Sequence, residues 1–330
     1  MDKKVRLIFW ATGLFCLLAA LASLTFGAVS LPLEVLWQAL WQGPKNTAGS
    51  IVWYIRLPRT LGCLLAGGAL AVSGCVLQSV LHNKLASPNI IGVNAGAGLA
   101  VTVCCCLGIL SGWAMALSAF GGAMICVLLV VFLARKTGAS RTMVILSGVA
   151  MNSMLNAMRD ALNTLVPDAA SLSGDFRVGG FSAVSATRLL PAAVLILLAL
   201  VAVLCLCAEL DVLMLGEETA RSLGLPVKRM RTLFLLLAAL LAGAAVSFAG
   251  LLSFVGLLVP HIARRFVGGR SGKLLPMCML LGAGFVTACD LAARMLFTPY
   301  ELPVGILMAV IGGPFFLILL LKRKGGYDDA

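Results

Sequence analysis

Few residues of this chain are placed to do chemistry, and the pattern nearest to a known motif is GGRSGKL at 268–274. A phosphate-binding loop needs glycine at the first motif position and serine or threonine at the last, where the chain has Val267 and Leu274. The two histidines, His82 and His261, have no carboxylate or cysteine at metal-ligand spacing. The 11 cysteines are scattered through apolar segments, which favours a packing role. We therefore expect no ATP site, no cofactor, no metal site and no enzymatic activity in the chain itself.

Four polar residues share one face of a predicted apolar helix. Asn152, Asn156, Arg159 and Asn163 recur at intervals that place them within about 60° of one another at about 100° per residue. A polar stripe on an apolar helix should face water or protein rather than lipid. We expect this stripe to line a translocation pathway, and hydrogen bonding between helices of one subunit is the alternative.

A second polar feature is the segment 208–231, which carries glutamates and arginines inside an otherwise apolar chain. Its centre predicts a short amphipathic helix over 217–223, preceded by Gly216 and closed by Gly224. Acidic residues at the start and Arg221 near the end suit the helix dipole. Such an element indicates docking on a separate soluble partner, and a solvated loop without a partner is the alternative.

The elements that must position these residues are membrane-spanning helices. The chain is 61% hydrophobic and 12% charged, with a mean hydropathy of +1.06, whereas soluble domains carry about 25% charged residues. Apolar runs of about 20 residues have the length that crosses a bilayer as a helix. We expect an all-α polytopic membrane protein with one domain over 1–330 and about ten transmembrane helices. The expected spans are 7–29, 60–82, 89–110, 113–134, 142–166, 189–208, 231–250, 252–267, 274–297 and 304–321.

The net charge of +12 follows from the topology rather than from nucleic acid binding. If both termini are cytoplasmic and the spans alternate, 18 of the 25 basic residues lie inside. Arg56, Arg59 and Arg294 lie on the outer side and so oppose this bias. Arg294 has a potential ion-pair partner in Asp290, four residues earlier, and snorkelling to the interface is the corresponding alternative for the other two. Segment 30–42 has apolar residues at helical spacing and predicts a helix at the outer interface.

Eight segments, in order and with conforming spacing, resemble the permease subunits of type II ABC importers, the family that takes up ferric siderophores, haem and cobalamin. They are IRLPR (55–59), GALAVSGCVLQ (68–78), NKLASPNIIGVNAGA (83–97), LDVLMLGEETARSLGL (210–225), FVGLLVPHIARRFVGG (254–269), LPMCMLLGA (275–283), DLAAR (290–294) and ELPVGILMAVIGGPFF (301–316). The resemblance covers nearly the whole chain and implies the type II ABC importer permease fold in a bacterial cytoplasmic membrane.

The resemblance also implies partners and sites. A cytoplasmic coupling loop at about 210–226 would dock on the ATPase subunit, and Arg56, Arg59 and Arg294 would receive acidic residues of an extracytoplasmic binding protein. A second copy of the chain or a close paralogue, two ATPase subunits and the lipid bilayer would complete the assembly. The residues implied for ATPase coupling are Leu215, Gly216, Glu217, Glu218, Ala220, Arg221, Leu223 and Gly224.

The function implied is a permease subunit of an ATP-driven importer that moves a ferric siderophore or similar metal chelate into the cytoplasm. Haem and cobalamin are the alternative substrates. A stand-alone secondary transporter is the alternative of another class. It would need a coupling-ion site, usually built from intramembrane carboxylates or broken helices. The acidic candidates Asp160 and Asp290 lie near predicted helix ends, and the loop at 213–225 has no use in that alternative.

Overall fold

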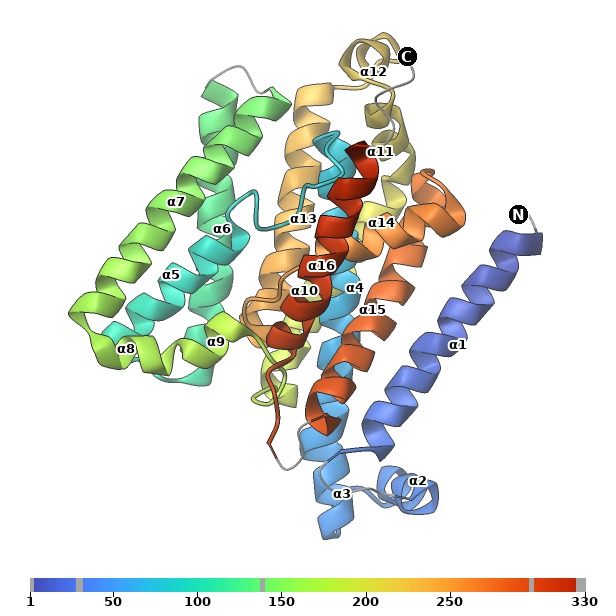
Figure 1. The fold of residues 1–330 in the computed structure, drawn as a ribbon, viewed down its shortest axis with the longest axis vertical. Coiled ribbons are helices and arrows are strands. Elements are labelled where there is room, and N and C mark those ends of the chain that lie inside the picture. Colours follow the sequence, from blue (N-terminus) through green and yellow to red (C-terminus); the bar gives the residue numbers. More distant parts are fainter. Residues whose placement is uncertain (1–2, 28–31, 137–139, 297–299, 325–330) are drawn as a thin grey trace.

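The computed structural model describes the chain except residues 1–2, 28–31, 137–139, 297–299 and 325–330. Every regular element among the described residues is a helix, and the long helices pack side by side as one bundle (Figure 1). The long helices are α1 (Lys3–Thr25), α4 (Leu57–Val80), α5 (Val93–Cys106), α6 (Gly112–Lys136), α7 (Arg141–Leu165), α10 (Ala186–Cys205), α13 (Val227–Ala249), α14 (Val255–Val267), α15 (Ser271–Met295) and α16 (Val304–Lys324).

Short helices lie at the two ends of the bundle. They are α2 (Leu33–Gln42), α3 (Thr47–Ile51), the π-helical turn η1 (Val52–Arg56), α8 (Pro167–Leu172), α9 (Gly174–Val178), α11 (Cys207–Met214) and α12 (Glu217–Ser222). The helix expected at the interface is α2. The short helix expected within 208–231 is α12. Both elements are therefore confirmed as helices.

Each of the ten predicted spans overlaps one long helix. Six helices of the described chain are long and apolar enough to cross a membrane: 3–25, the continuous 47–80, 112–136, 186–205, 227–249 and 271–295. Helix α5 and the apolar part of α16 are shorter, α14 has 13 residues, and α7 is long but less apolar because of its polar stripe. The count of ten crossings therefore stays a prediction. Two predicted spans end in residues 28–29 and 297, which lie outside the described residues.

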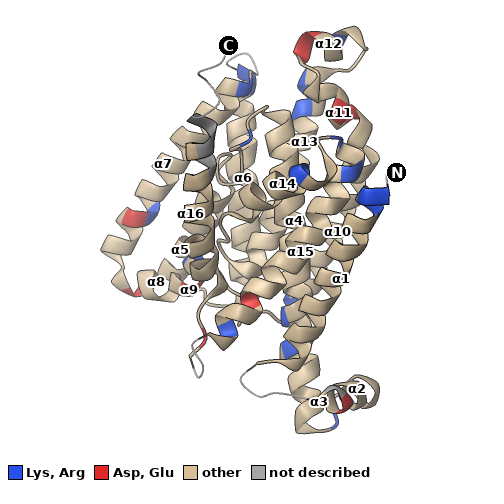
Figure 2. Cartoon of the chain, turned by 45° about the vertical axis from the view of Figure 1, so that its right-hand side comes forward, with Lys and Arg blue, Asp and Glu red and all other residues tan. Residues whose placement is uncertain are grey.

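The two ends of the bundle differ in the short helices that they carry and in their charged residues. Helix α1 begins and α16 ends at the end that carries α12, whereas α2, α3, α8 and α9 lie at the opposite end (Figure 1). Basic residues gather at the end of the bundle that carries α12, and the middle of the bundle carries few charged residues (Figure 2). This distribution is typical of a membrane protein whose α12 end faces the cytoplasm. The assignment of that end to the cytoplasm stays a prediction.

Glycines allow α4 to pack closely against its neighbours at the centre of the bundle. Helix α4 lies against α13, α14 and α15. A Cβ atom on Gly67 would overlap the carbonyl of Gly282 in α15, and a Cβ atom on Gly74 would overlap Gly256 in α14. Small residues bring helix backbones together where lipid removes the hydrophobic drive for association. Ser73 adds a hydrogen bond of 2.6 Å to the carbonyl of Ala238.

The turn between α13 and α14 is irregular but its backbone is hydrogen-bonded. Gly250 and Phe254 have φ angles of +70° and +66°, so the chain reverses without regular structure. The amide of Leu251 donates to the carbonyl of Phe176 at 2.9 Å, and the amide of Gly180 donates to that of Ala249 at 2.9 Å. Irregular backbone is tolerated inside a membrane protein where neighbouring protein satisfies it. Helix α9 and the segment after it therefore hold the end of α13 and the start of the turn.

Candidate functional site

The end of the bundle opposite α12 holds a buried ion-pair network centred on Asp290 of α15, which is 1% exposed. Arg59 of α4 forms a bidentate pair with this carboxylate. Its Nε atom donates to Oδ2 and its Nη2 atom donates to Oδ1, each at 3.0 Å. Arg294 Nε lies 3.1 Å from the same Oδ2 atom. Arg59 Nη1 also donates to Glu301 Oε2 at 2.8 Å. The network therefore joins α4, α15 and the segment that leads into α16.

Hydrogen bonds extend this network to α1. Arg294 Nη2 donates to Ser23 Oγ at 2.8 Å, and Ser23 Oγ lies 2.8 Å from Thr60 Oγ1. Arg56 Nη1 donates to the carbonyls of Leu24 and Thr25 at 2.7 and 2.8 Å. A cation on the last carbonyls of a helix satisfies acceptors that have no intrahelical partner and opposes the negative end of the dipole. Arg56 therefore caps the C-terminus of α1.

The structure tests two of the predictions made for Arg56, Arg59 and Arg294. The Arg294–Asp290 pair, predicted from four-residue spacing, is confirmed. Snorkelling into water is wrong for Arg56 and Arg59, because the two residues are only 5% and 7% exposed and bind within the bundle. Binding-protein docking by these arginines stays a prediction. Sequence reasoning missed Glu301, although an acidic residue in the ELPVG segment that closely follows Arg294 in the chain was an available signal.

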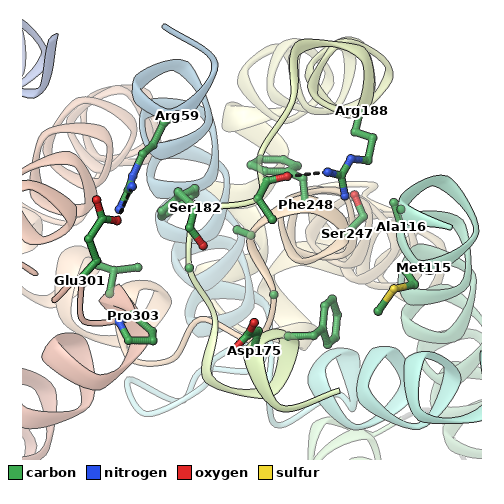
Figure 3. A pocket seen from close by; sticks show the side chains of 18 of the residues that line it. Arg59, Met115, Ala116, Asp175, Ser182, Arg188, Ser247, Phe248, Glu301 and Pro303 are labelled. Carbon is green, nitrogen blue, oxygen red and sulfur yellow. Dashed lines mark hydrogen bonds and ion pairs between the residues drawn. The ribbon is translucent and has the colours of Figure 1, made fainter. Parts of the chain in front are cut away.

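A cavity of about 400 Å³ opens beside the network (Figure 3). Its wall comes from α6, α9, the segment after α9, the end of α13 and the segment before α16. Arg188 bridges part of this wall by donating to the carbonyl of Ala183, and Ser182 and Asp175 lie across the opening (Figure 3). The cavity combines charged groups with the rings of Phe176 and Phe248. The sequence pattern did not predict it, because its wall comes from segments far apart in the chain.

The polar stripe of α7 faces its neighbour α5 rather than open solvent. Asn152 Nδ2 donates to the carbonyl of Asn89 at 2.6 Å. Arg159 lies over Gly98 of α5 and pairs with Asp160 at 3.1 Å. All four stripe residues, including Asn156 and Asn163, are half-buried. Asn152 is therefore hydrogen-bonded within the subunit, but to the turn before α5 and not to another helix. A role of the stripe in the translocation pathway stays a prediction.

Helix α12 projects beyond the bundle (Figure 1). Leu215 and Leu223 are 61% and 62% exposed, whereas Ala220 is fully buried. Gly216 and Gly224 have φ angles of +111° and +82°, which L residues rarely adopt, so glycine is needed at both turns. The structure thus presents one exposed leucine at each end of a short helix that is bounded by two glycine turns.

The charged residues of α12 point in different directions. Glu218 and Arg221 are exposed to solvent. The carboxylate of Glu217 turns toward the bundle, where it accepts a hydrogen bond from the buried Arg231 and lies near Arg141. Burial alone would raise the pKa of Glu217, but the Arg231 hydrogen bond and the surrounding guanidinium charges outweigh it and lower the pKa. Glu217 is therefore a carboxylate held in its charged form by arginines that sequence reasoning treated only as topology markers.

Comparison with known proteins shows that the chain is similar to transport permeases. The model of the FecCD transport family matches residues 15–322. The chain is 36% identical over 310 residues to the ferric enterobactin transport system permease protein FepG of Escherichia coli (strain K12), covering 94% of both chains. It is 36% identical over 337 residues to the vitamin B12 import system permease protein BtuC of Klebsiella pneumoniae, covering 98% of this chain and 96% of that protein.

A solved structure has the same fold. It is described as a metal-chelate type ABC transporter in an inward-facing conformation, and it superimposes on this chain with a TM-score of 0.84 at 30% identity. The superposition covers 96% of this chain and 99% of that one. The arrangement of helices is thus that of an importer permease throughout the chain.

Proposed function

The chain belongs to the FecCD transport family, and we propose from this premise that it moves a ferric siderophore or a similar metal chelate into the cytoplasm. It is a multi-pass permease subunit of an ABC importer, and separate subunits hydrolyse the ATP. The observation that carries the proposal is the match of family and fold over almost the whole length. Cobalamin is the second candidate substrate, because the similarity to a vitamin B12 permease is of the same size.

We infer that α12 docks on a cytoplasmic ATPase subunit. Two exposed leucines, Leu215 and Leu223, flank an exposed charged face that carries Glu218 and Arg221. An apolar pair with a polar rim is typical of a protein interface. The position of α12 at the end where basic residues gather supports a cytoplasmic partner (Figure 2).

We further propose that the outer end receives an extracytoplasmic binding protein. Arg59 is buried against Asp290, but its Glu301 partner is half exposed and borders the cavity of Figure 3. An acidic side chain of a binding protein could replace Glu301 on Arg59 without exposing the Asp290 pair. Arg56 and Arg294, which are bound to α1, would support that site.

We propose that two copies of the chain, or this chain and a close paralogue, form the pathway between them with α7 as a lining helix. The exposed face of α7 carries Met154 and Met158, which are about half exposed. The polar stripe beside them is half-buried, so a modest rotation of α7 would expose it. A weakly polar wall of this kind suits a bulky chelate that passes without tight binding.

Purification of the tagged chain from its host membrane in mild detergent tests the proposed function. The expected result is a stoichiometric ATPase subunit that co-purifies and hydrolyses ATP. The matched control is the Leu215→Glu/Leu223→Glu variant, which should insert normally but lose the ATPase subunit. Recovery of the unaltered chain without any ATP-hydrolysing partner would contradict the proposal.

A further inference from the structure

Glu217, the first residue of α12, contacts guanidinium groups from three helices. Its Oε1 atom accepts a hydrogen bond from Arg231 of α13 and lies 3.9 Å from Nε of Arg141, the first residue of α7. Its Oε2 atom lies 3.4 Å from Arg221 of α12. Arg231 is 4% exposed, so the Oε1 side of this carboxylate reaches into the bundle, whereas the Glu217 side chain as a whole is 33% exposed.

We propose that Glu217 is a positioning residue that fastens α12 to the first turn of α7, so that a displacement of α12 moves α7. The inference rests on the proposed function, in which an ATPase subunit acts on α12. It assigns to Glu217 an internal role in place of the direct docking contact implied by the sequence resemblance. Helix α7 is the helix that carries the polar stripe of Asn152 to Asn163.

The Arg231 contact makes α12 and α13 one unit. Glu217 and Arg231 are 14 residues apart, and their hydrogen bond closes the segment that contains α12 and the turn at Gly224. A carboxylate–guanidinium hydrogen bond with one partner buried is among the stronger polar contacts in proteins. A force on α12 is therefore transmitted to the first turns of α13.

The Arg141 contact extends this unit to α7. Arg141 and Arg231 are close enough to repel each other, and the carboxylate of Glu217 lies near both. If this negative charge is removed, the repulsion between the two arginines is no longer offset. The start of α7 should then move away from α13. At 3.9 Å the contact between Arg141 and Glu217 is an ion pair rather than a directed hydrogen bond. The attraction between the two charges therefore persists when α12 is displaced by a small distance.

A distance measurement on the permease alone tests the link directly. Spin labels at the exposed positions Thr142 and Thr219, in a background without native cysteines, report the separation of α7 and α12. In nanodiscs, Glu217→Gln should lengthen and broaden the distance distribution. The control Glu34→Gln, at an exposed carboxylate on α2 at the opposite end, should leave it unchanged. The same distribution in Glu217→Gln and unaltered protein would overturn the inference.

A second measurement uses the permease assembled with its ATPase subunits in proteoliposomes. Glu217→Gln should lower the amount of substrate transported per ATP by about tenfold, the factor implied by loss of a charge-assisted hydrogen bond. Glu217→Asp, which keeps the charge, should recover part of this loss. ATPase affinity should change less than twofold.

The two measurements separate the inference from the proposed function. Lost ATPase affinity with an unchanged α7–α12 distance would make Glu217 a docking residue and overturn the inference. The proposed function would then survive. Failure of the unaltered chain to assemble with any ATPase would overturn the proposed function, while the distance measurement would still report the link.

Discussion

Replacing Asp290 with asparagine should destabilise the permease strongly while preserving the shape of the side chain. Asp290 is 1% exposed and neutralises Arg59 and Arg294, which are also buried. Asparagine can accept one hydrogen bond from Arg59 but carries no charge. The two guanidinium groups would then face each other across a neutral amide in the protein interior.

The expected size follows from the burial of the network. Removing one partner of a buried ion pair costs about 3–5 kcal/mol, because a charge is left without compensation in a medium of low polarity. Glu301 partly compensates Arg59, but its side chain is 40% exposed, so it replaces only part of the lost Asp290 charge. With about 2 °C per kcal/mol for a large domain, the midpoint of thermal unfolding should fall by about 6–10 °C.

Thermal unfolding in detergent, followed by tryptophan fluorescence, measures the effect. Asp168→Asn on α8 is the matched control, because the same substitution at an exposed carboxylate should shift the midpoint by less than about 1 °C. Adding Arg294→Gln to Asp290→Asn should recover part of the loss, since one of the two uncompensated charges is removed. A midpoint for Asp290→Asn within about 2 °C of the unaltered protein would refute the reasoning.

Three further outcomes are expected. Gly74→Val should abolish accumulation of folded protein, measured by gel filtration, because a side chain there overlaps Gly256 of α14. Leu215→Glu with Leu223→Glu should weaken ATPase-subunit binding by at least tenfold in a pull-down titration without changing thermal stability, since both are exposed. The lowered pKa of Glu217 keeps its α7 link intact above the ordinary glutamate pKa of about 4.3. The label separation should therefore stay constant from pH 8 to 5 and lengthen only below about pH 4.

Local hydrophobic patterns in the sequence predicted where the helices lie. They did not predict the first and last residues of a helix where contacts with residues distant in the sequence determine them. The span predicted to begin at residue 60 belongs to a helical run that begins at Thr47. Arg56 and Arg59 signalled the end of an apolar segment, yet the helix runs through both. Their charges are met by the end of α1, 31 residues away, and by Asp290, 231 residues away. Pairings at such separations cannot be derived from periodicity.

The same reasoning explains which site contacts could be foreseen. The Asp290–Arg294 pair was predictable because both residues lie on one helix face at four-residue spacing. The Glu217 contacts with Arg141 and Arg231 were not, because these arginines come from α7 and α13 and had already been explained by topology. The α7 stripe was recognised as a shared face, but its neighbour α5 could not be identified from the stripe itself. Motif resemblance supplied function, whereas the structure supplied the contacts.

Uptake of a radioactive ferric siderophore into proteoliposomes tests the central claim most directly. The vesicles would contain the purified chain with its co-purified ATPase subunit and enclose ATP on the ATPase side, and the binding protein would be added outside. The account predicts accumulation that requires ATP, stops when the ATPase subunit is omitted and persists when ion gradients are collapsed. Uptake by the chain alone, driven by an ion gradient without ATP, would contradict it and identify a secondary transporter.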